Sequence, residues 1–294
     1  MQKFQDWFTQ QWAILWGRKI DPNDFLWLRG PFGDLAGIGD DFINQLAEKE
    51  NLVIERDKKP HGLIPSVSLL NLSDSELSGL SQKVIGFYEN TANYNVYFSI
   101  KWNPFFKLFG ILVNTLFSNR INQLNIPTRN IKNPEAIKSQ IITLSDPESS
   151  EVKYTIWLRR FTSTDQVLYS GVYGVCRLPS GKTCIKAVFP LPKGNATVIL
   201  SPRTGENGEL ILDSSGKKFG DAGFYFVLQD SKGSYWAQYI RSFRDRLTIG
   251  IENDHLSAEQ TLTLWHQRVL RFKYKIELKE QVALSKPTRF LYDE

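Results

Sequence analysis

Alternating apolar and polar residues recur in short segments along the second half of the chain, from residue 153 to residue 277. Near its end, for example, Leu270, Phe272 and Tyr274 alternate with Arg271 and Lys273. Successive side chains of a strand point to opposite faces, so this pattern predicts a strand with one buried face. We expect ten such strands, at residues 152–161, 166–177, 182–189, 195–201, 209–213, 223–228, 234–242, 246–252, 258–265 and 268–277.

Turn-forming residues separate these segments. Asn207-Gly208 is the strongest signal, because Asn-Gly suits the backbone of a two-residue hairpin turn. No crossover helix is expected between the segments, so neighbouring strands should run antiparallel. An open sheet of this length would expose edge strands whose unpaired backbone groups promote aggregation. We therefore predict a meander that is closed or strongly curled, like a barrel.

Helical patterns dominate the first 150 residues. Helices are expected at residues 1–20, at 41–51 behind capping aspartates, and from Ser73 to about Tyr94. A fourth helix, 105–124, has one apolar face that we expect to be buried against the meander: Phe105, Leu108, Phe109, Leu112 and Leu116. One strand, 139–144, is expected in the polar linker 128–150.

These patterns predict an α+β fold in which N-terminal helices pack on a large antiparallel β-meander. The predicted regions are a helical part (1–150), the meander or barrel (151–278) and a C-terminal tail (279–294). The helices are the natural cover for an open end of the meander, so the chain is expected to form one folding unit.

The composition limits the possible binding partners and the cellular compartment of the protein. The net charge is +5, but 36 basic and 31 acidic residues are too evenly mixed to indicate a nucleic-acid partner. Two cysteines do not make a secreted disulfide scaffold, and Asp6 interrupts any signal peptide. The longest apolar stretch, 104–117, contains Lys107 and is too short to span a bilayer. A cytoplasmic location is expected.

The N-terminal pattern has two interpretations. Its aromatic residues favour a helix docked on the domain core, because its polar face is not rich in Lys and Arg. The alternative is weak contact with a membrane surface through Trp7, Trp12 and Trp16.

Motifs for cofactors and metals are missing from the sequence. Gly37-Ile38-Gly39 matches neither a dinucleotide fingerprint nor a phosphate-binding loop, so no cofactor is expected. None of His61, His255 and His266 has a second ligand at metal-binding spacing, so no metal site is expected.

Four short motifs carry a resemblance. They are Phe87-Tyr88-Glu89, the segment from Arg120 to Leu124, Trp157-Leu158-Arg159, and the segment from Phe189 to Asn195. With these motifs the chain, from about Trp27 onward, resembles a family of uncharacterised bacterial proteins. The resemblance implies a common fold and no established activity. It also implies that Glu89, Arg120, Gln123 and Asn195 matter for folding or function.

Few side chains are candidates for catalysis. Lys186 lies between apolar residues and is a weak candidate for a nucleophile inside the barrel, although strand periodicity equally allows it to point outward. His266 is a weak candidate for a general base, but a structural role is more typical of its position. Cys176 and Cys184 should face each other across a turn, as buried thiols rather than as a disulfide.

Arginine and tyrosine recur within the same strands. If they face inward, they form an apolar pocket with a cationic end, which suits a ligand with a carboxylate or phosphate head. The candidate ligand-binding residues are Arg159, Tyr173, Arg177, Tyr239 and Arg241, with Glu89 as an internal partner for the charge. We expect binding of a small hydrophobic or amphipathic molecule between meander and helices. The alternatives are an isomerase, cyclase or lyase on the same scaffold, or a peripheral membrane or interaction protein.

Overall fold

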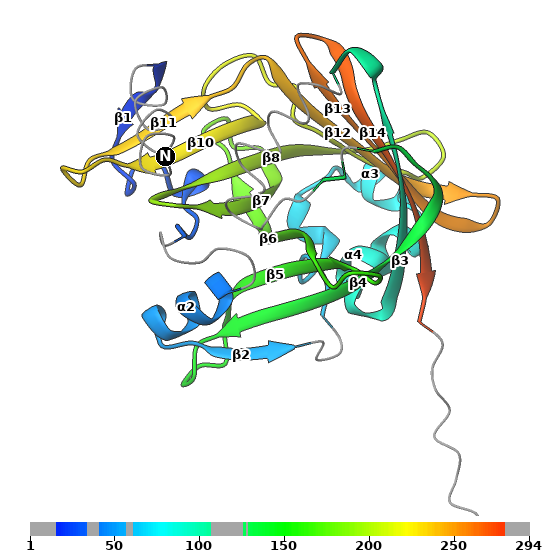
Figure 1. The fold of residues 1–294 in the computed structure, drawn as a ribbon, viewed down its shortest axis with the longest axis horizontal. Coiled ribbons are helices and arrows are strands. Elements are labelled where there is room, and N and C mark those ends of the chain that lie inside the picture. Colours follow the sequence, from blue (N-terminus) through cyan, green and yellow to red (C-terminus); the bar gives the residue numbers. More distant parts are fainter. Residues whose placement is uncertain (1–15, 34–40, 57–60, 107–125, 128, 280–294) are drawn as a thin grey trace, which may run out of the picture.

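The computed structural model describes residues 16–33, 41–56, 61–106, 126–127 and 129–279 of the 294-residue chain. Its described strands form one antiparallel sheet (Figure 1). The strands are β1 (Arg18–Ile20), β2 (Val53–Arg56), β3 (Tyr94–Trp102), β4 (Ile131–Ser145), β5 (Val152–Phe161), β6 (Val167–Arg177), β7 (Thr183–Leu191), β8 (Gly194–Thr204), β9 (Leu210–Asp213), β10 (Gly223–Gln229), β11 (Tyr235–Tyr239), β12 (Phe243–Glu252), β13 (His255–Leu264) and β14 (Gln267–Leu278). The helices that lie wholly within the described residues are α2 (Asp41–Glu50), α3 (Asp74–Gly79) and α4 (Gln82–Glu89), with three short 3-10 helices at Leu26–Leu28, Val67–Leu70 and Thr91–Asn93.

Ten of the described strands close into a barrel. The order around it is β8-β7-β6-β5-β4-β3-β14-β13-β12-β9, and β9 pairs back onto β8. The ladder between β3 and β14 joins the first and last barrel strands, with Phe98 opposite Tyr274. The hairpin between β8 and β9 turns at Asn207-Gly208, where Gly208 has a φ of +78° that favours glycine. A closed antiparallel barrel is confirmed, but β3 and β4 lie before the predicted meander, and β10 and β11, which were predicted within it, lie outside the ring.

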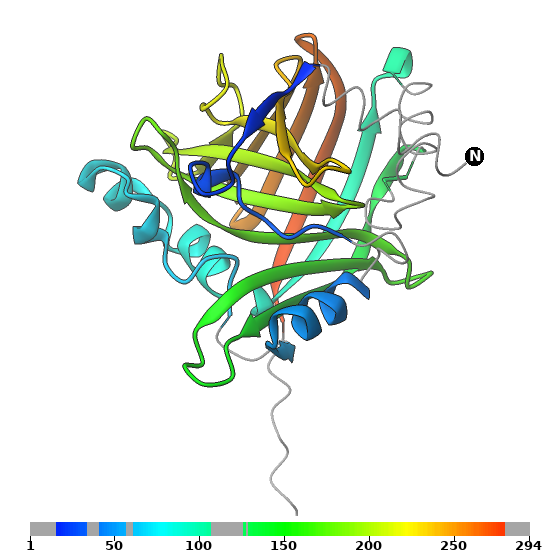
Figure 2. The same cartoon turned by 90° about the vertical axis from the view of Figure 1, so that its left-hand side faces the viewer.

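Two barrel strands fork, because each pairs with different strands along its length. The first half of β8 pairs with β10, which continues through β11 to β1 as a side sheet, and its second half pairs with β9. Similarly, β4 pairs with β3 over residues 131–137 and with β2 over residues 142–145. The side sheet and β2 lie on different parts of the barrel wall (Figures 1 and 2).

Strand alternation places the largest apolar cluster on the inner face of the barrel. Phe272 and Ile276 of β14 are buried there, whereas Lys273 and Lys275 between them are exposed, as predicted. Removing such side chains from water contributes about 1.5–3 kcal/mol for each fully buried large residue.

The helices cover the barrel at two places. The helices α3 and α4 lie at one end of the barrel (Figure 2), where Phe87 and Tyr88 of α4 are buried with their ring centroids 5.6 Å apart. Ser73 and Glu76 form a capping box at the start of α3, so the predicted helix start is confirmed. Helix α2 packs its apolar side on the outer face of β4 and β5.

The first 150 residues differ from the prediction. They contain β3 and the whole of the long β4, two barrel strands in a region predicted as mainly helical, so the described fold is mainly β. The helix predicted from Ser73 to Tyr94 is broken after Gly79 and ends at Glu89. The predicted boundary at residue 150 falls within the hairpin between β4 and β5. Of the helix predicted at 105–124, residues 107–124 lie outside the described residues.

Other predictions concern individual residues. Phe105 is 92% exposed, so its predicted burial against the meander is wrong. Cys176 and Cys184 face each other across the ladder between β6 and β7, as predicted, and both are buried free thiols. Burial raises the pKa of Cys176 to about 11 and that of Cys184 to about 12, so both thiols are protonated at neutral pH.

Phe98 and Phe105 form a matched pair for a test of the core. Phe98→Ala removes a ring that is 0% exposed and should lower the free energy of unfolding by about 3–5 kcal/mol. Phe105→Ala removes an exposed ring and should change it by less than about 0.5 kcal/mol. Urea unfolding of both variants measures the difference, and equal effects would contradict the closure of β3 into the core.

Candidate functional site

The barrel contains a cavity of about 100 Å³. Most of its wall is apolar, and at the covered end Leu63, Phe87 and Tyr88 form part of the lining. The polar side chains of barrel strands that line it come from β5, β6, β12, β13 and β14: Arg159, Tyr169, Tyr173, Asp245, Gln260 and Tyr274. We call this cavity the lumen.

Arg159 of β5 brings a cation into the lumen. Its side chain lies between two rings, with the guanidinium carbon 4.0 Å from the ring centroid of Trp157 and 4.6 Å from that of Tyr169. Nη2 donates a hydrogen bond of 2.8 Å to Oη of Tyr173, whereas the buried Nε has no hydrogen-bond partner. None of the ion pairs between described residues includes Arg159. The charge is held by aromatic faces and a phenol rather than by a carboxylate.

Asp245 of β12 brings a carboxyl group to the opposite wall. The strands β5 and β12 are five steps apart around the ten-strand ring in either direction. Oδ2 of Asp245 accepts a hydrogen bond of 2.7 Å from Nε2 of Gln260, and Oε1 of Gln260 accepts one of 3.1 Å from Oη of Tyr274. Oδ1 is buried without a partner. The backbone N–H of Asp245 donates to Oγ of Ser214 at 2.6 Å, which fixes the strand at this point.

Burial controls the protonation of these groups. Burial raises the pKa of Asp245 to about 7, although the hydrogen bond from Gln260 acts to lower it. The negative charge of Asp213 also contributes to the rise. Burial also raises the pKa of Tyr169 and Tyr274, so both phenols stay neutral. At neutral pH the lumen therefore contains one fixed cation and one carboxyl group near its titration midpoint.

The other arginine and tyrosine candidates lie outside the lumen. Arg177 is exposed and donates from Nε to the carbonyl oxygen of Gly181 at 3.2 Å. Tyr239 packs in the side-sheet cluster and donates to the carbonyl oxygen of Gly216 at 2.6 Å. Arg241 is exposed in the turn after β11, because that strand ends at Tyr239. The structure thus brings only Arg159 and Tyr173 of the predicted set together.

The two weak catalytic candidates also lie outside the lumen. Lys186 is on the outer face of β7, since Ile185 and Ala187 on either side of it line the lumen. Its Nζ donates to the carbonyl oxygen of Arg29 at 2.7 Å, and burial under this segment lowers its pKa. His266 is exposed in the turn between β13 and β14.

The residues implied by the family resemblance have structural contacts where they are described. Oε1 of Glu89 accepts hydrogen bonds from Oγ of Ser66 and from the backbone N–H of Val67, so Glu89 is not the partner of Arg159. Asn195 is fully buried, donates to the carbonyl oxygen of Gly30 at 3.3 Å and so ties the N-terminal segment to β8. Arg120 and Gln123 lie outside the described residues.

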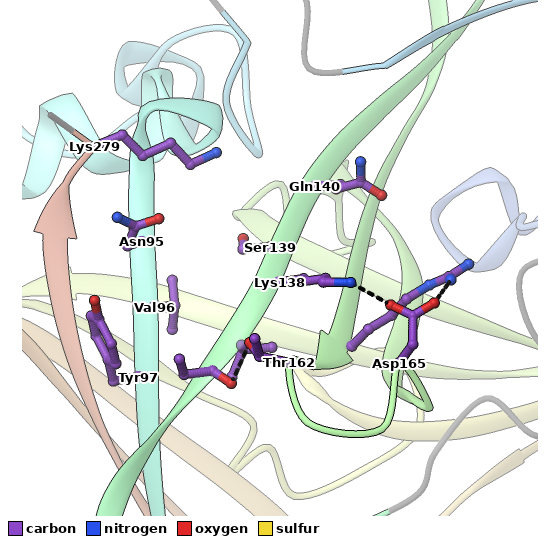
Figure 3. A pocket seen from close by; sticks show the side chains of 12 residues that line it. Asn95, Val96, Tyr97, Lys138, Ser139, Gln140, Thr162, Asp165 and Lys279 are labelled. Atoms are coloured by element: carbon purple, nitrogen blue, oxygen red, sulfur yellow. Dashed lines mark hydrogen bonds and ion pairs between the residues drawn. The ribbon is translucent and has the colours of Figure 1, made fainter. Parts of the chain in front are cut away.

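A groove of about 490 Å³ lies in the fork between β3 and β4 (Figure 3). Lys138 and Arg160 share the carboxylate of Asp165 at 2.8 and 2.9 Å on one side of it, and Lys279 lies on the other side. Val96 lines both this groove and the lumen.

Ser139 connects the groove to the lumen wall. It lines the groove, and its Oγ accepts a hydrogen bond of 2.8 Å from Nε1 of Trp157, whose ring faces Arg159. A thin layer of side chains therefore separates a basic groove on the surface from the buried arginine.

Comparison with known proteins gives one bacterial relative. The chain is similar to the protein named "Uncharacterized membrane protein YndJ" of Bacillus subtilis (strain 168). The two are 25% identical over 243 residues, which are 81% of this chain and 41% of that protein. No family model and no solved structure matches the chain. The resemblance to bacterial proteins without an established activity is confirmed.

The chain thus spans about 41% of the length of this relative. Among the described residues, no helix has the length and apolar character needed to cross a bilayer. Trp16 is exposed, whereas Trp7 and Trp12 lie outside the described residues, so contact of these residues with a membrane stays a prediction. The cytoplasmic location also stays a prediction.

Sequence reasoning missed Asp245, Gln260 and Tyr274 as site residues. The predicted strand began at residue 246, which left Asp245 in a turn, but β12 begins at Phe243. The available signal was the alternation of Phe243, Asp245, Leu247 and Ile249, which puts one carboxylate in an otherwise apolar face. An acidic residue at an inward position of a strand is unusual enough to mark a site.

Asp245→Asn tests the buried carboxyl group. Unfolded Asp titrates near pH 4, whereas folded Asp245 titrates near pH 7, so the wild-type protein loses stability as pH rises between these values. The shift of about three pH units corresponds to roughly 4 kcal/mol. The asparagine side chain does not ionise, so the substitution should raise the free energy of unfolding by up to that amount at pH 8 and by little at pH 4, as measured by urea unfolding.

Asp165→Asn is the control for this pH dependence. Its carboxylate is exposed, and hydrogen bonds from Lys138 and Arg160 lower its pKa, so its removal should reduce stability above pH 4. The same sign of change for both variants would contradict the burial of Asp245.

Proposed function

We propose that the chain binds a small amphipathic molecule with an acidic head group in the lumen of the barrel. The observation that carries the proposal is Arg159, a guanidinium that is only 6% exposed and has no carboxylate partner among the described residues. A buried charge without a counterion costs several kcal/mol, and the rings of Trp157 and Tyr169 offset part of that cost. A bound anion would offset the rest.

The free donor of Arg159 supports a carboxylate as the head group. Nε is buried without a partner, and an arginine Nε together with one Nη is the donor pair that binds a carboxylate through two parallel hydrogen bonds. The apolar wall of the lumen would take the rest of the molecule. The basic groove between β3 and β4 lies next to this site and would attract an anion toward it.

The volume of the lumen limits the size of the ligand. Sites for drug-sized molecules measure about 300–1,000 Å³, and one water molecule takes a share of about 30 Å³ in the liquid. A lumen of about 100 Å³ therefore fits a short carboxylic acid of a few carbon atoms rather than a long fatty acid.

Asp245 supports an enzyme as the second candidate function. A buried carboxyl group with a pKa of about 7 has the property of a general acid or base, as an isomerase or lyase needs. The test is NMR of short acids incubated with the protein in D₂O. A new product or deuterium incorporation that disappears in Asp245→Asn would favour the enzyme, and unchanged acids would favour the binding protein.

Arg159→Met is the test of the binding function. The wild-type protein should bind unsubstituted acids of three to six carbon atoms and should not bind those of ten or more, as measured by calorimetric titration. Loss of the guanidinium should weaken binding of the short acids at least about tenfold, the effect of one charge-assisted hydrogen bond. Stability should stay similar or rise, because an apolar side chain of similar volume replaces a buried ion.

Arg177→Met is the matched control, since it removes an exposed arginine of the neighbouring strand β6. Its affinity for the same acids should equal that of the wild-type protein. Equal loss of binding in both variants, or none in Arg159→Met, would refute a counterion role for Arg159.

A further inference from the structure

Two polar atoms in the lumen lack partners, and they lie on opposite walls. Nε of Arg159 belongs to β5 and Oδ1 of Asp245 belongs to β12, five strands away around the barrel. Both residues are 94% buried, since each is 6% exposed, and both line the same cavity. Buried polar atoms in folded proteins are almost always hydrogen bonded, so two unpaired atoms on residues that line one cavity point to a molecule that fills it.

We propose that the lumen ligand has two polar ends: a carboxylate that binds Arg159 and a hydroxyl group that donates a hydrogen bond to Oδ1 of Asp245. This inference rests on the proposed function and specifies its ligand class as a short hydroxycarboxylic acid. The middle of the molecule would lie against the apolar wall between the two ends, which includes Val198, Leu212 and Ala258.

The fixed surroundings of both groups favour this orientation. Oη of Tyr173 already accepts from one donor of Arg159, and Nε2 of Gln260 already donates to Oδ2 of Asp245, while each side chain keeps a buried polar atom without a partner. Gln260 is itself held by Tyr274. The two free atoms are therefore preorganised, and a ligand that matches them costs little rearrangement.

Water is the competing occupant. The lumen is large enough to hold water, which would also bind polar atoms of its wall. A hydroxy acid satisfies the two unpaired atoms and also covers the apolar wall, so it should displace the water. An acid without the hydroxyl group would leave Oδ1 unpaired.

The experiment compares matched pairs of acids by calorimetric titration at pH 8. Each ω-hydroxy acid of three to six carbon atoms is paired with the unsubstituted acid of the same length. The wild-type protein should bind at least one hydroxy acid about tenfold more tightly than its partner, the effect of one hydrogen bond. Asp245→Val should bind both members of that pair with equal affinity, and the retained binding shows that this variant is folded.

Arg159→Met separates this inference from the proposed function. If unsubstituted acids bind and Arg159→Met abolishes that binding, but no hydroxy acid is preferred, the proposed function stands and the two-ended ligand is wrong. A preference that survives in Asp245→Val also overturns the inference. If the wild-type protein binds neither kind of acid, both proposals fail.

Discussion

Closure of the barrel is the constraint on which the other features of this structure depend. The ladder between β3 and β14 joins the barrel strands that come first and last in the sequence. Without it, both strands would be exposed sheet edges. Closure also separates an inside from an outside, so alternate side chains of every barrel strand are withdrawn from water. The high pKa of Asp245 and the electrostatic cost of Arg159 arise from this separation, because in an open sheet water would solvate both groups.

The polar side chains of the lumen show how a barrel holds charge without ion pairing. Arg159 lies between two aromatic rings. Asp245 accepts a hydrogen bond from the amide of Gln260, which in turn accepts one from the hydroxyl group of Tyr274. Each group is kept in place by neighbours that carry no formal charge. A direct ion pair between them would fill the lumen with its own side chains, whereas this arrangement leaves space between the walls.

The sequence predicted the second half of the fold well and the first half poorly, for physical reasons. From β5 to β14 most strands are linked by short turns and alternate regularly, so local pattern and fold agree, and the predicted ends mostly fall within a few residues. The strand β3 was missed because residues 95–102, between two predicted helices, were assigned to no element, although Val96, Phe98 and Ile100 alternate inward. Arg159 was found as a charge in an apolar strand, but whether Arg177 and Arg241 also face inward depended on register and strand ends, which only pairing with distant strands decides.

The fork in β8 has a consequence for how the molecule unfolds. One half of this strand belongs to the side sheet and the other half to the barrel, so neither sheet has a complete set of backbone hydrogen bonds without the other. Val198 lies in the half of β8 that pairs with β10, and Leu200 lies just after that half. Both residues line the lumen. Loss of the side sheet would therefore open the wall of the lumen, and the barrel and side sheet should behave as one cooperative unit rather than as two domains.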